Sequence, residues 1–364
     1  MNISPPEDTL APLDLSDRPS KVRSKLPEGT ALVVTDSSNI QWLTGFTGSN
    51  GTVYMDHEDF LLITDKRYQE QAPQQISEVQ ASAEITVSQD PINVISKSSR
   101  RKTIHIDPTL VTWERHQRLA EGIEGEINPS SPLKELRAQK DKGEIERIAL
   151  AARIVDLALQ ETIPLLECRM SEMEIAAHLD YKIRALGASG NAYQTIVASG
   201  ANSAIPHAQP STKTVDEGDL VIIDVGAVVD GYRSDMTRTF VIGEPDEQQQ
   251  KYLAAVREAQ RETVQKLKPG VPCAELDRYC REKIEEAGWG EHFIHGTGHG
   301  VGLDIHESPM INSKSEDTLL SGMIITIEPG IYFTDSCGVR WEDLFEITES
   351  GARQLTLSAK SPRV

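Results

Sequence analysis

The sequence has few cysteines and no segment that could cross a membrane as a helix. Its four cysteines (Cys168, Cys273, Cys280 and Cys337) are scattered among 364 residues without a C-x-x-C pair, which argues against cysteine-ligated zinc and a disulfide framework. No apolar run approaches the ~20 residues that span a bilayer. The first residues lack the basic start and the apolar stretch of a signal peptide. These absences predict a cytoplasmic protein with reduced thiols and no membrane partner.

Positive charge is also scarce. Lysine and arginine number 37 against 56 acidic residues, which gives a formal net charge of -19. A surface this acidic repels phosphate backbones, so nucleic acid is not expected as a partner. The composition, 38% hydrophobic and 26% charged residues, is that of a soluble globular protein. The length predicts two domains.

The first 130 residues predict an α/β domain. Short β-rich runs alternate with helical segments, a pattern that favours strands packed against helices. The predicted strands are 31–34, 52–55, 60–64, 85–87 and 103–106. The Gly-rich segment 45–51 lacks the Lys-Ser/Thr of a phosphate loop, so it predicts a loop with special backbone angles. The Pro- and Ser-containing segment 128–133 predicts the boundary between a domain of residues 1–130 and one of residues 131–364.

The sequence of the second domain predicts two helices followed by strands, and then two further helices followed by strands. An amphipathic helix over 142–163 and a helix opened by a capping box at Ser171 and Glu174 come first. The predicted strands 195–199, 219–226 and 231–241 follow. Further helices over 246–267 and 273–287 precede a His-rich stretch and the strands 323–328 and 339–347. The predicted class is α+β with a structural duplication.

The His-rich stretch, residues 294–307, reads I-H-G-T-G-H-G-V-G-L-D-I-H-E. It carries three of the nine histidines: His295, His299 and His306. Glycines beside His299 let backbone approach whatever the imidazole binds. Taken alone, the stretch fits either a three-histidine metal site or a Gly-rich turn with surface histidines.

Four carboxylates narrow that choice. Asp224, Asp235, Glu328 and Glu342 occur within or beside apolar strand segments, where burial is costly unless a carboxylate is paired or binds a cation. One such residue is explained by a salt bridge or a strand end. If all four converge, they cannot remain ionised without cations. Oxygen donors with one imidazole suit two ions of Mn, Co, Fe or Zn, about 3.5–4 Å apart.

Six motifs give a specific resemblance. In chain order they are I-P-H at His207, D-V-G at Asp224, S-D-M-T-R-T-F at Asp235, G-T-G-H-G-V-G-L-D-I-H-E at His299, I-E-P-G-I-Y at Glu328 and V-R-W-E-D at Glu342. Residues 190–350 thereby resemble the pita-bread metallopeptidases, which include Xaa-Pro aminopeptidases (aminopeptidase P), prolidases and methionine aminopeptidases. The segments N-I-Q-W-L-T-G-F-T-G-S-N-G and I-T-D-K-R-Y resemble the creatinase/prolidase N-terminal domain. The resemblance implies a pita-bread catalytic domain after a smaller α/β domain.

The resemblance also implies a role for each matching residue. Two divalent metal ions per subunit, with manganese favoured over cobalt, zinc or iron, would be bound by Asp224, Asp235, His299, Glu328 and Glu342. A hydroxide between the ions would attack the scissile carbonyl while Glu328 accepts a proton.

Four further residues complete the implied site. His207 and His306 would contact the substrate and the tetrahedral intermediate, and His295 would line the pocket on the proline side. Arg340 would support the ligands from behind.

Within this family the N-terminal domain favours a proline-directed enzyme, since methionine aminopeptidases usually lack it. Resembling prolidases often carry an arginine for the dipeptide carboxylate four residues after the H-E histidine, where this chain has Met310. We therefore predict an Xaa-Pro aminopeptidase, with an Xaa-Pro dipeptidase as the alternative. Trp341, unusual before the glutamate, is expected to narrow or line the pocket. Similar enzymes are commonly homodimers.

More distant alternatives are a methionine aminopeptidase, a metal-free creatinase-like hydrolase and a non-catalytic binding module. The last two classes lack the full ligand set, whereas this chain keeps all five residues.

Overall fold

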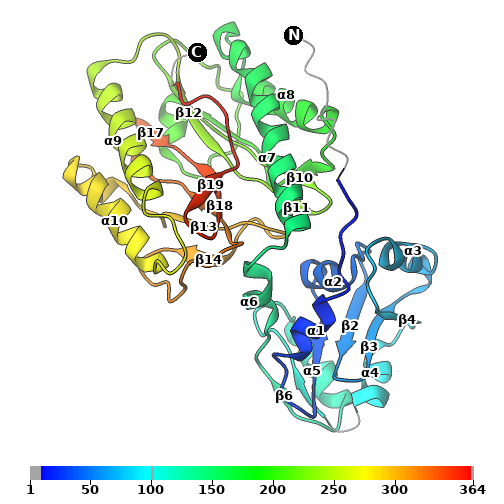
Figure 1. Ribbon diagram of the computed structural model, residues 1–364. Helices are drawn as coiled ribbons and strands as arrows, with labels where there is room; N and C mark the ends of the chain where they lie inside the picture. Colours follow the sequence, from blue (N-terminus) through cyan, green and yellow to red (C-terminus); the bar gives the residue numbers. More distant parts are fainter. Residues whose placement is uncertain (1–9, 100–101, 362–364) are drawn as a thin grey trace. The chain divides into compact units, whose positions relative to one another are not determined.

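The computed structural model describes residues 10–99 and 102–361 (Figure 1). The chain folds into two compact units, the first of Ala11–Arg137 and the second containing Ala138–Val364. Among the described residues, no helix is both long and apolar enough to span a membrane.

The first unit is built on one six-stranded sheet in the order β4-β3-β2-β1-β5-β6. Its strands are β1 (Thr30–Val34), β2 (Gly51–Met55), β3 (Phe60–Thr64), β4 (Glu84–Val87), β5 (Thr103–His105) and β6 (Ile127–Asn128). Strand β1 runs antiparallel to β2 and parallel to β5, and β3 runs parallel to β4. Every residue of β2 and β3 is buried, so these two strands lie in the core of the first unit. All five strands predicted in this part of the chain are present.

Helices accompany the sheet of the first unit. They are α1 (Arg18–Arg23), α2 (Ser37–Thr44), α3 (Gln71–Glu78), α4 (Pro91–Ser99), α5 (Trp113–Gly122) and α6 (Leu133–Ala138), with a 3₁₀ turn η1 (Lys66–Tyr68). Helix α2 begins at Asp36, whose carboxylate accepts a hydrogen bond from the Asn39 amide at 2.9 Å. It ends at Gly45, which has a φ of 72°. The first glycine of the 45–51 segment therefore has the special backbone angle that was predicted there.

The second unit contains two pairs of long helices. They are α7 (Lys142–Thr162), α8 (Glu172–Ala185), α9 (Glu247–Val264) and α10 (Cys273–Glu286), with 3₁₀ turns η2 (Ile163–Cys168), η3 (Gly200–Ala204) and η4 (Gly290–His292). In Figure 1, α7 lies beside α8 and α9 beside α10. The predicted capping box of α8 is confirmed, because Ser171 and Glu174 each bond the backbone of the other.

Each helix pair packs mainly against its own set of strands, although α9 and α10 also share a core with Leu220 and Val241 of the first set. The first set is β7 (Gly190–Asn191), β8 (Ile196–Ser199), β9 (Leu220–Asp224), β10 (Ala227–Val229), β11 (Tyr232–Arg233) and β12 (Thr237–Val241). The second is β13 (Gly298–Gly300), β14 (Glu307–Ile311), β15 (Ile324–Ile327), β16 (Gly330–Phe333), β17 (Cys337–Arg340), β18 (Asp343–Ile347) and β19 (Ala352–Gln354). Sheets β12-β9-β8 and β14-β13-β15-β18-β19 contribute apolar residues to cores shared with the helices. The duplicated order is that of the predicted α+β fold.

Two predicted strands are wrong as continuous elements. The expected strand 231–241 is two strands, β11 and β12, with Asp235 between them. The expected strand 339–347 is likewise divided into β17 and β18 at Glu342. The Glu342 amide still donates to the Thr237 carbonyl of β12 at 3.1 Å. Both interruptions occur at carboxylates predicted to bind metal.

The capping box of α8 gives a testable prediction for stability. Ser171→Ala removes the side-chain acceptor of the Glu174 amide, and loss of such a cap costs about 1 kcal/mol. We expect the second unit to unfold at a lower temperature by scanning calorimetry, while Ser171→Thr, which keeps a hydroxyl, behaves like the unmodified chain. An unchanged transition in Ser171→Ala would contradict this account of how α8 begins.

Candidate metal centre and active site

One cavity in the second unit brings the predicted site residues together. It has a volume of about 980 Å³. All nine predicted residues line it: His207, Asp224, Asp235, His295, His299, His306, Glu328, Arg340 and Glu342. They come from segments separated by up to 135 positions in the chain, from residue 207 to residue 342. The fold therefore supplies the convergence that sequence spacing alone could not establish.

Strand ends and strand breaks position four of the five predicted ligands. Asp224 is the last residue of β9, and Glu328 directly follows β15. Asp235 and Glu342 occupy the gaps before β12 and β18, and His299 is the middle residue of β13. At each break the backbone leaves the ladder of strand hydrogen bonds.

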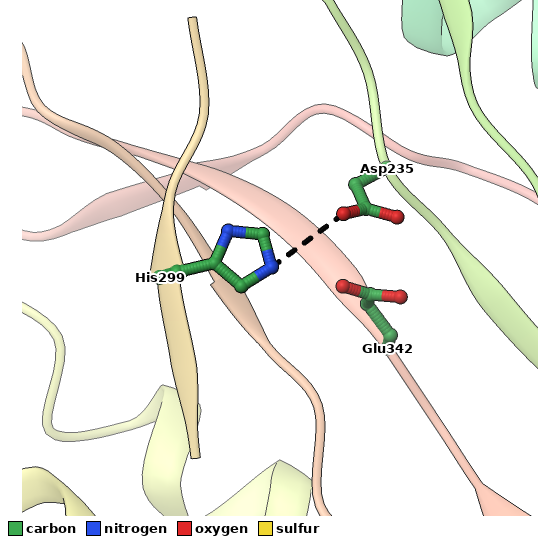
Figure 2. A group of neighbouring side chains, drawn as sticks. All are labelled: Asp235, His299 and Glu342. Carbon is green, nitrogen blue, oxygen red and sulfur yellow. Dashed lines mark ion pairs between the residues drawn. The ribbon is translucent and has the colours of Figure 1, made fainter. Parts of the chain in front are cut away.

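Asp235, His299 and Glu342 form the tightest group (Figure 2). One ligand atom from each lies within 4.8 Å of the other two, and all three side chains are buried. His299 Nε2 is 3.6 Å from Asp235 Oδ2 and 3.4 Å from Glu328 Oε1. These distances exceed direct hydrogen bonds, and they leave space for a cation between the donor atoms.

The environment of His299 fixes which nitrogen faces the carboxylates. Its Nδ1 is 3.0 Å from the Gly300 carbonyl oxygen, so Nδ1 carries the proton and Nε2 presents a lone pair. The neighbouring glycines are required by close packing. A Cβ on Gly298 would lie 2.1 Å from the Thr326 carbonyl oxygen, and one on Gly300 would lie 2.3 Å from that of Ser308. The G-H-G sequence therefore brings the imidazole into a site with no space for side chains beside it.

The electrostatics of the cluster favour cations. Burial, followed by the charge of Asp224, raises the pKa of Asp235 well above its ordinary value. Burial and Asp235 do the same to the pKa of Glu342, and burial raises the pKa of Glu328. Glu342 Oε1 is buried without a hydrogen-bond partner among the described residues. An unpaired carboxylate oxygen at this position costs free energy unless a cation binds there, so the donor set fits divalent metal ions.

Tyr193 belongs to the site although none of the sequence motifs includes it. Its hydroxyl oxygen is 2.5 Å from both Asp224 Oδ1 and Asp235 Oδ1. The hydroxyl has one proton, so it donates to one carboxylate at a time. Burial and the adjacent aspartates raise the pKa of Tyr193 well above its ordinary value, which keeps the hydroxyl protonated and able to hold both side chains in place.

Arg340 links the carboxylates to the loop that carries His207. Its guanidinium donates to Asp224 Oδ2 at 2.6 Å, to the Tyr332 hydroxyl at 2.7 Å and to the Pro206 carbonyl at 3.2 Å. Thr237 accepts a further bond from Arg340 at 3.1 Å and donates to Glu342 Oε2 at 2.7 Å. A single side chain thereby orients ligands on β9 and before β18.

Glu172 holds the same loop from its other side, and sequence analysis missed it. Its fully buried carboxylate accepts hydrogen bonds from the amides and hydroxyls of Ser199 and Ser211 and from the Asn202 side chain, at 2.7–3.0 Å. Six donor contacts explain how a charge is tolerated without exposure. The loop between Ser199 and Ser211 is therefore fixed at both ends around His207.

The three remaining histidines differ in exposure. His207 and His306 are exposed within the cavity, and the His306 ring lies 4.3 Å from that of His299. His306 is exposed at its surface yet partly enclosed by the cavity, and this partial burial together with the charges of His299 and His207 lowers its pKa to about 4, so its ring is neutral at pH 7. His295 contacts the Tyr332 hydroxyl at 3.0 Å and packs against Phe293. These positions surround the space next to the carboxylates.

The expectation for Trp341 is wrong. Its side chain has no exposed surface and packs in a core with Leu253, Val256 and Val339. The guanidinium groups of Arg238 and Arg257 each lie 5.2 Å from its ring centre. Because successive residues point to opposite sides of extended backbone, Glu342 faces the cavity while Trp341 faces the helices. Trp341 supports the site from behind and does not narrow it.

Met310 does line the cavity, and it is 39% exposed. Of the described residues in this lining, Arg340 is the one arginine and there is no lysine. Arg340 is already engaged by Asp224, so the described lining offers no free arginine or lysine to a dipeptide carboxylate.

Fold and site together define a metal-dependent hydrolase. Residues 146–349 match the family described as Metallopeptidase family M24, and residues 28–139 match the Creatinase/Prolidase N-terminal domain. The chain therefore belongs to metallopeptidase family M24 and has the pita-bread catalytic fold. The predicted family, fold class and enzyme class are confirmed.

Particular relatives agree with this assignment. The chain is 48% identical to an Xaa-Pro dipeptidase of Pyrococcus furiosus over 224 residues, which are 62% of this chain and 64% of that protein. The structure matches that of an Xaa-Pro dipeptidase from Bacillus anthracis with a TM-score of 0.90 and 34% identity, over 96% and 99% of the two chains. It matches an X-Pro aminopeptidase from Thermotoga maritima MSB8 with a TM-score of 0.85 and 34% identity, over 96% and 100%.

Metal analysis separates the roles predicted for two histidines. His299→Ala removes a nitrogen donor from the buried group, so the purified chain is expected to retain fewer divalent ions. His306→Ala is expected to keep its ions and to lose about 10²–10³ in kcat, the loss typical of one transition-state contact. Elemental analysis and peptide hydrolysis are compared for both variants. Equal metal loss in the two would refute the distinction.

A Trp341 variant tests the correction for that residue. Trp341→Phe keeps an aromatic ring in the core but loses packing, so we expect unfolding to become easier by about 1–2 kcal/mol, less than the ~3–5 kcal/mol of truncation to alanine. KM for peptides should stay within about twofold, because the side chain does not face the cavity. A several-fold change in KM at unchanged stability would show that the Trp341 side chain contacts the substrate.

Proposed function

We propose that this chain hydrolyses the bond between a residue and a following proline, with Xaa-Pro dipeptides as the preferred substrates. The observation that carries the proposal is the single cavity in which Asp235, His299 and Glu342 place ligand atoms within 4.8 Å. Two of the relatives described above are named Xaa-Pro dipeptidases. They favour the dipeptidase more strongly than the aminopeptidase that the sequence placed first, although the Thermotoga maritima neighbour keeps the aminopeptidase compatible.

In this proposal Asp224, Asp235, His299, Glu328 and Glu342 bind two divalent ions, with manganese as the preferred metal. When bound, such ions supply an activated water at neutral pH and neutralise developing negative charge. The contribution of the chain itself is orientation. Arg340 donates to Asp224 at 2.6 Å, and the Tyr193 hydroxyl, 2.5 Å from one oxygen of each aspartate, donates to either of them.

Glu328 is the proposed proton acceptor during attack. Glu328 lines the cavity beside the other proposed ligands, and a carboxylate within hydrogen-bond reach of the attacking water can accept its proton. Its Oε1 is 3.4 Å from His299 Nε2, so it lies beside the position where the attacking oxygen would be held.

His207 and His306 would stabilise the substrate carbonyl and the tetrahedral intermediate. A neutral imidazole donates a hydrogen bond to a developing oxyanion without first losing a proton to it, and the pKa of about 4 keeps His306 in that form. His295, next to Tyr332, would contact the proline ring. The Xaa-Pro bond has no N–H, so recognition must come from shape and from contacts to the carbonyl.

A specific observation keeps the Xaa-Pro aminopeptidase as the second candidate. Met310 occupies the position at which resembling prolidases often have an arginine, and the described lining has no spare cation. We further propose a cytoplasmic homodimer in which residues 1–130 form the accessory domain and 131–364 the catalytic domain.

Substrate length separates the two candidates. The manganese-loaded enzyme is given Ala-Pro and Ala-Pro-Ala, and kcat/KM is measured for each. We expect the dipeptide to be cleaved more efficiently, because the named relatives are dipeptidases. Faster cleavage of the tripeptide would establish the aminopeptidase instead, and cleavage of neither would remove the proline-directed function.

Met310→Arg provides the matched variant. An arginine at this exposed position adds a fork-shaped donor for a carboxylate. If the carboxylate of a bound dipeptide lies near residue 310, KM for Ala-Pro should fall several-fold while KM for Ala-Pro-Ala changes less. Met310→Gln controls for polarity without charge. An equal effect of both substitutions would show that residue 310 is remote from the carboxylate.

A further inference from the structure

A second cavity lies within the first unit, apart from the metal centre. It has a volume of about 180 Å³ and lies between the carboxyl ends of the sheet strands and the helices α4 and α5. Its floor is apolar, formed by buried side chains that include Val33, Ile63, Ile95 and Leu119. The proposed hydrolysis leaves this cavity without a role.

The cavity lies where the sheet topology predicts a ligand. Thr35, Thr64, Ser88 and Ile106 line it, and each ends or directly follows one of the strands β1, β3, β4 and β5. These strands all run in one direction, with β2 reversed between β1 and β3. The sheet order changes direction between β1 and β5, since the chain extends from β1 through β4 and then returns to the other side of β1. Open α/β sheets bind ligands at the carboxyl ends of strands at such a switch point.

The charge of the cavity is opposite to that of the chain. Arg115 and Arg118 of α5 line it, and none of its described lining residues is acidic, although the chain as a whole carries a formal charge of -19. Arg115 donates to the Thr35 carbonyl at 2.8 Å, at the rim. Arg118 is exposed and forms no hydrogen bond or ion pair with the part of the chain that the structure describes. The first turn of α4 begins at the same edge, but the Asp90 carboxylate accepts a hydrogen bond from the Asn93 amide there at 3.2 Å, so the positive charge of the cavity comes from the two arginines.

Size and lining together limit the ligand. A cavity of roughly 150 Å³ holds a molecule as large as benzene, so 180 Å³ accommodates about six to nine non-hydrogen atoms. The apolar floor favours a branched aliphatic body. The arginines favour one planar anionic group, because a guanidinium pairs with a carboxylate through two parallel hydrogen bonds. The absence of an acid among the described lining residues disfavours a ligand that also carries an ammonium group.

We propose that this cavity is a binding site for a small branched aliphatic monocarboxylate, whose carboxylate pairs with Arg118 and whose body contacts the floor formed by Ile63, Ile95 and Leu119. The site is separate from the peptidase centre, and its existence does not depend on the proposed hydrolysis.

Calorimetric titration of the full chain with 3-methylbutanoate tests the proposal. We expect saturable binding that is weakened at least tenfold in Arg118→Gln, because the variant loses the charged partner of the carboxylate. The neutral amide, 3-methylbutanamide, and acetate, which lacks the branched body, should each bind at least tenfold more weakly to the unmodified chain. Arg118 is exposed, so the substitution is not expected to impair folding.

Arg153→Gln is the matched control, since Arg153 is an exposed arginine of α7 in the other unit. Its affinity for 3-methylbutanoate should stay within twofold. Undetectable binding to the unmodified chain would overturn the proposal. Equal binding by Arg118→Gln would do the same, because it would assign the ligand to another place such as the metal centre. Binding of inorganic phosphate as tight as that of the carboxylate would also overturn it.

Discussion

The structure of the second unit depends on one electrostatic constraint, the burial of several carboxylates side by side. Asp235 and Glu342 are 5% and 2% exposed; the charge of Asp235 raises the pKa of Glu342, and the charge of Asp224 raises that of Asp235. Like charges this close cannot all persist unless cations or protons neutralise them. The fold supplies orientation through Tyr193, Thr237 and Arg340, but one oxygen of Glu342 remains without a partner among the described residues. Divalent ions complete the arrangement.

The chain around the site is organised to hold these carboxylates and not to maximise regular structure. Strands end or divide at Asp224, Asp235 and Glu342. The residues on both sides of His299 are glycines because β13 lies so close to Thr326 and Ser308 that a Cβ would not fit. Behind the site, Trp341 and the helices α9 and α10 provide a packed core that fixes the segment leading to Glu342. The strands are therefore irregular at the site, whereas the residues behind the site pack in a regular core.

Much of this arrangement could be predicted from the sequence, because it is encoded in short motifs and apolar periodicity. The helices and most strands follow from patterning, and the six motifs identify residues that line one cavity. The breaks at Asp235 and Glu342 were missed, since residues that favour strands continue on both sides of each break while the strand pairing does not. Tyr193 and Glu172 were missed because their partners are distant in sequence. The orientation of Trp341 depended on the position of a strand end, which patterning leaves uncertain by several residues.

The central claim is that divalent cations complete the carboxylate cluster, and titration of chelator-treated protein with Mn²⁺ tests it most directly. Calorimetry should show about two ions bound per chain, with a matching rise in the unfolding temperature because the ions bind the folded state. A chain that binds no Mn²⁺, Co²⁺ or Zn²⁺ at this site, and whose unfolding temperature does not respond to them, would contradict the account.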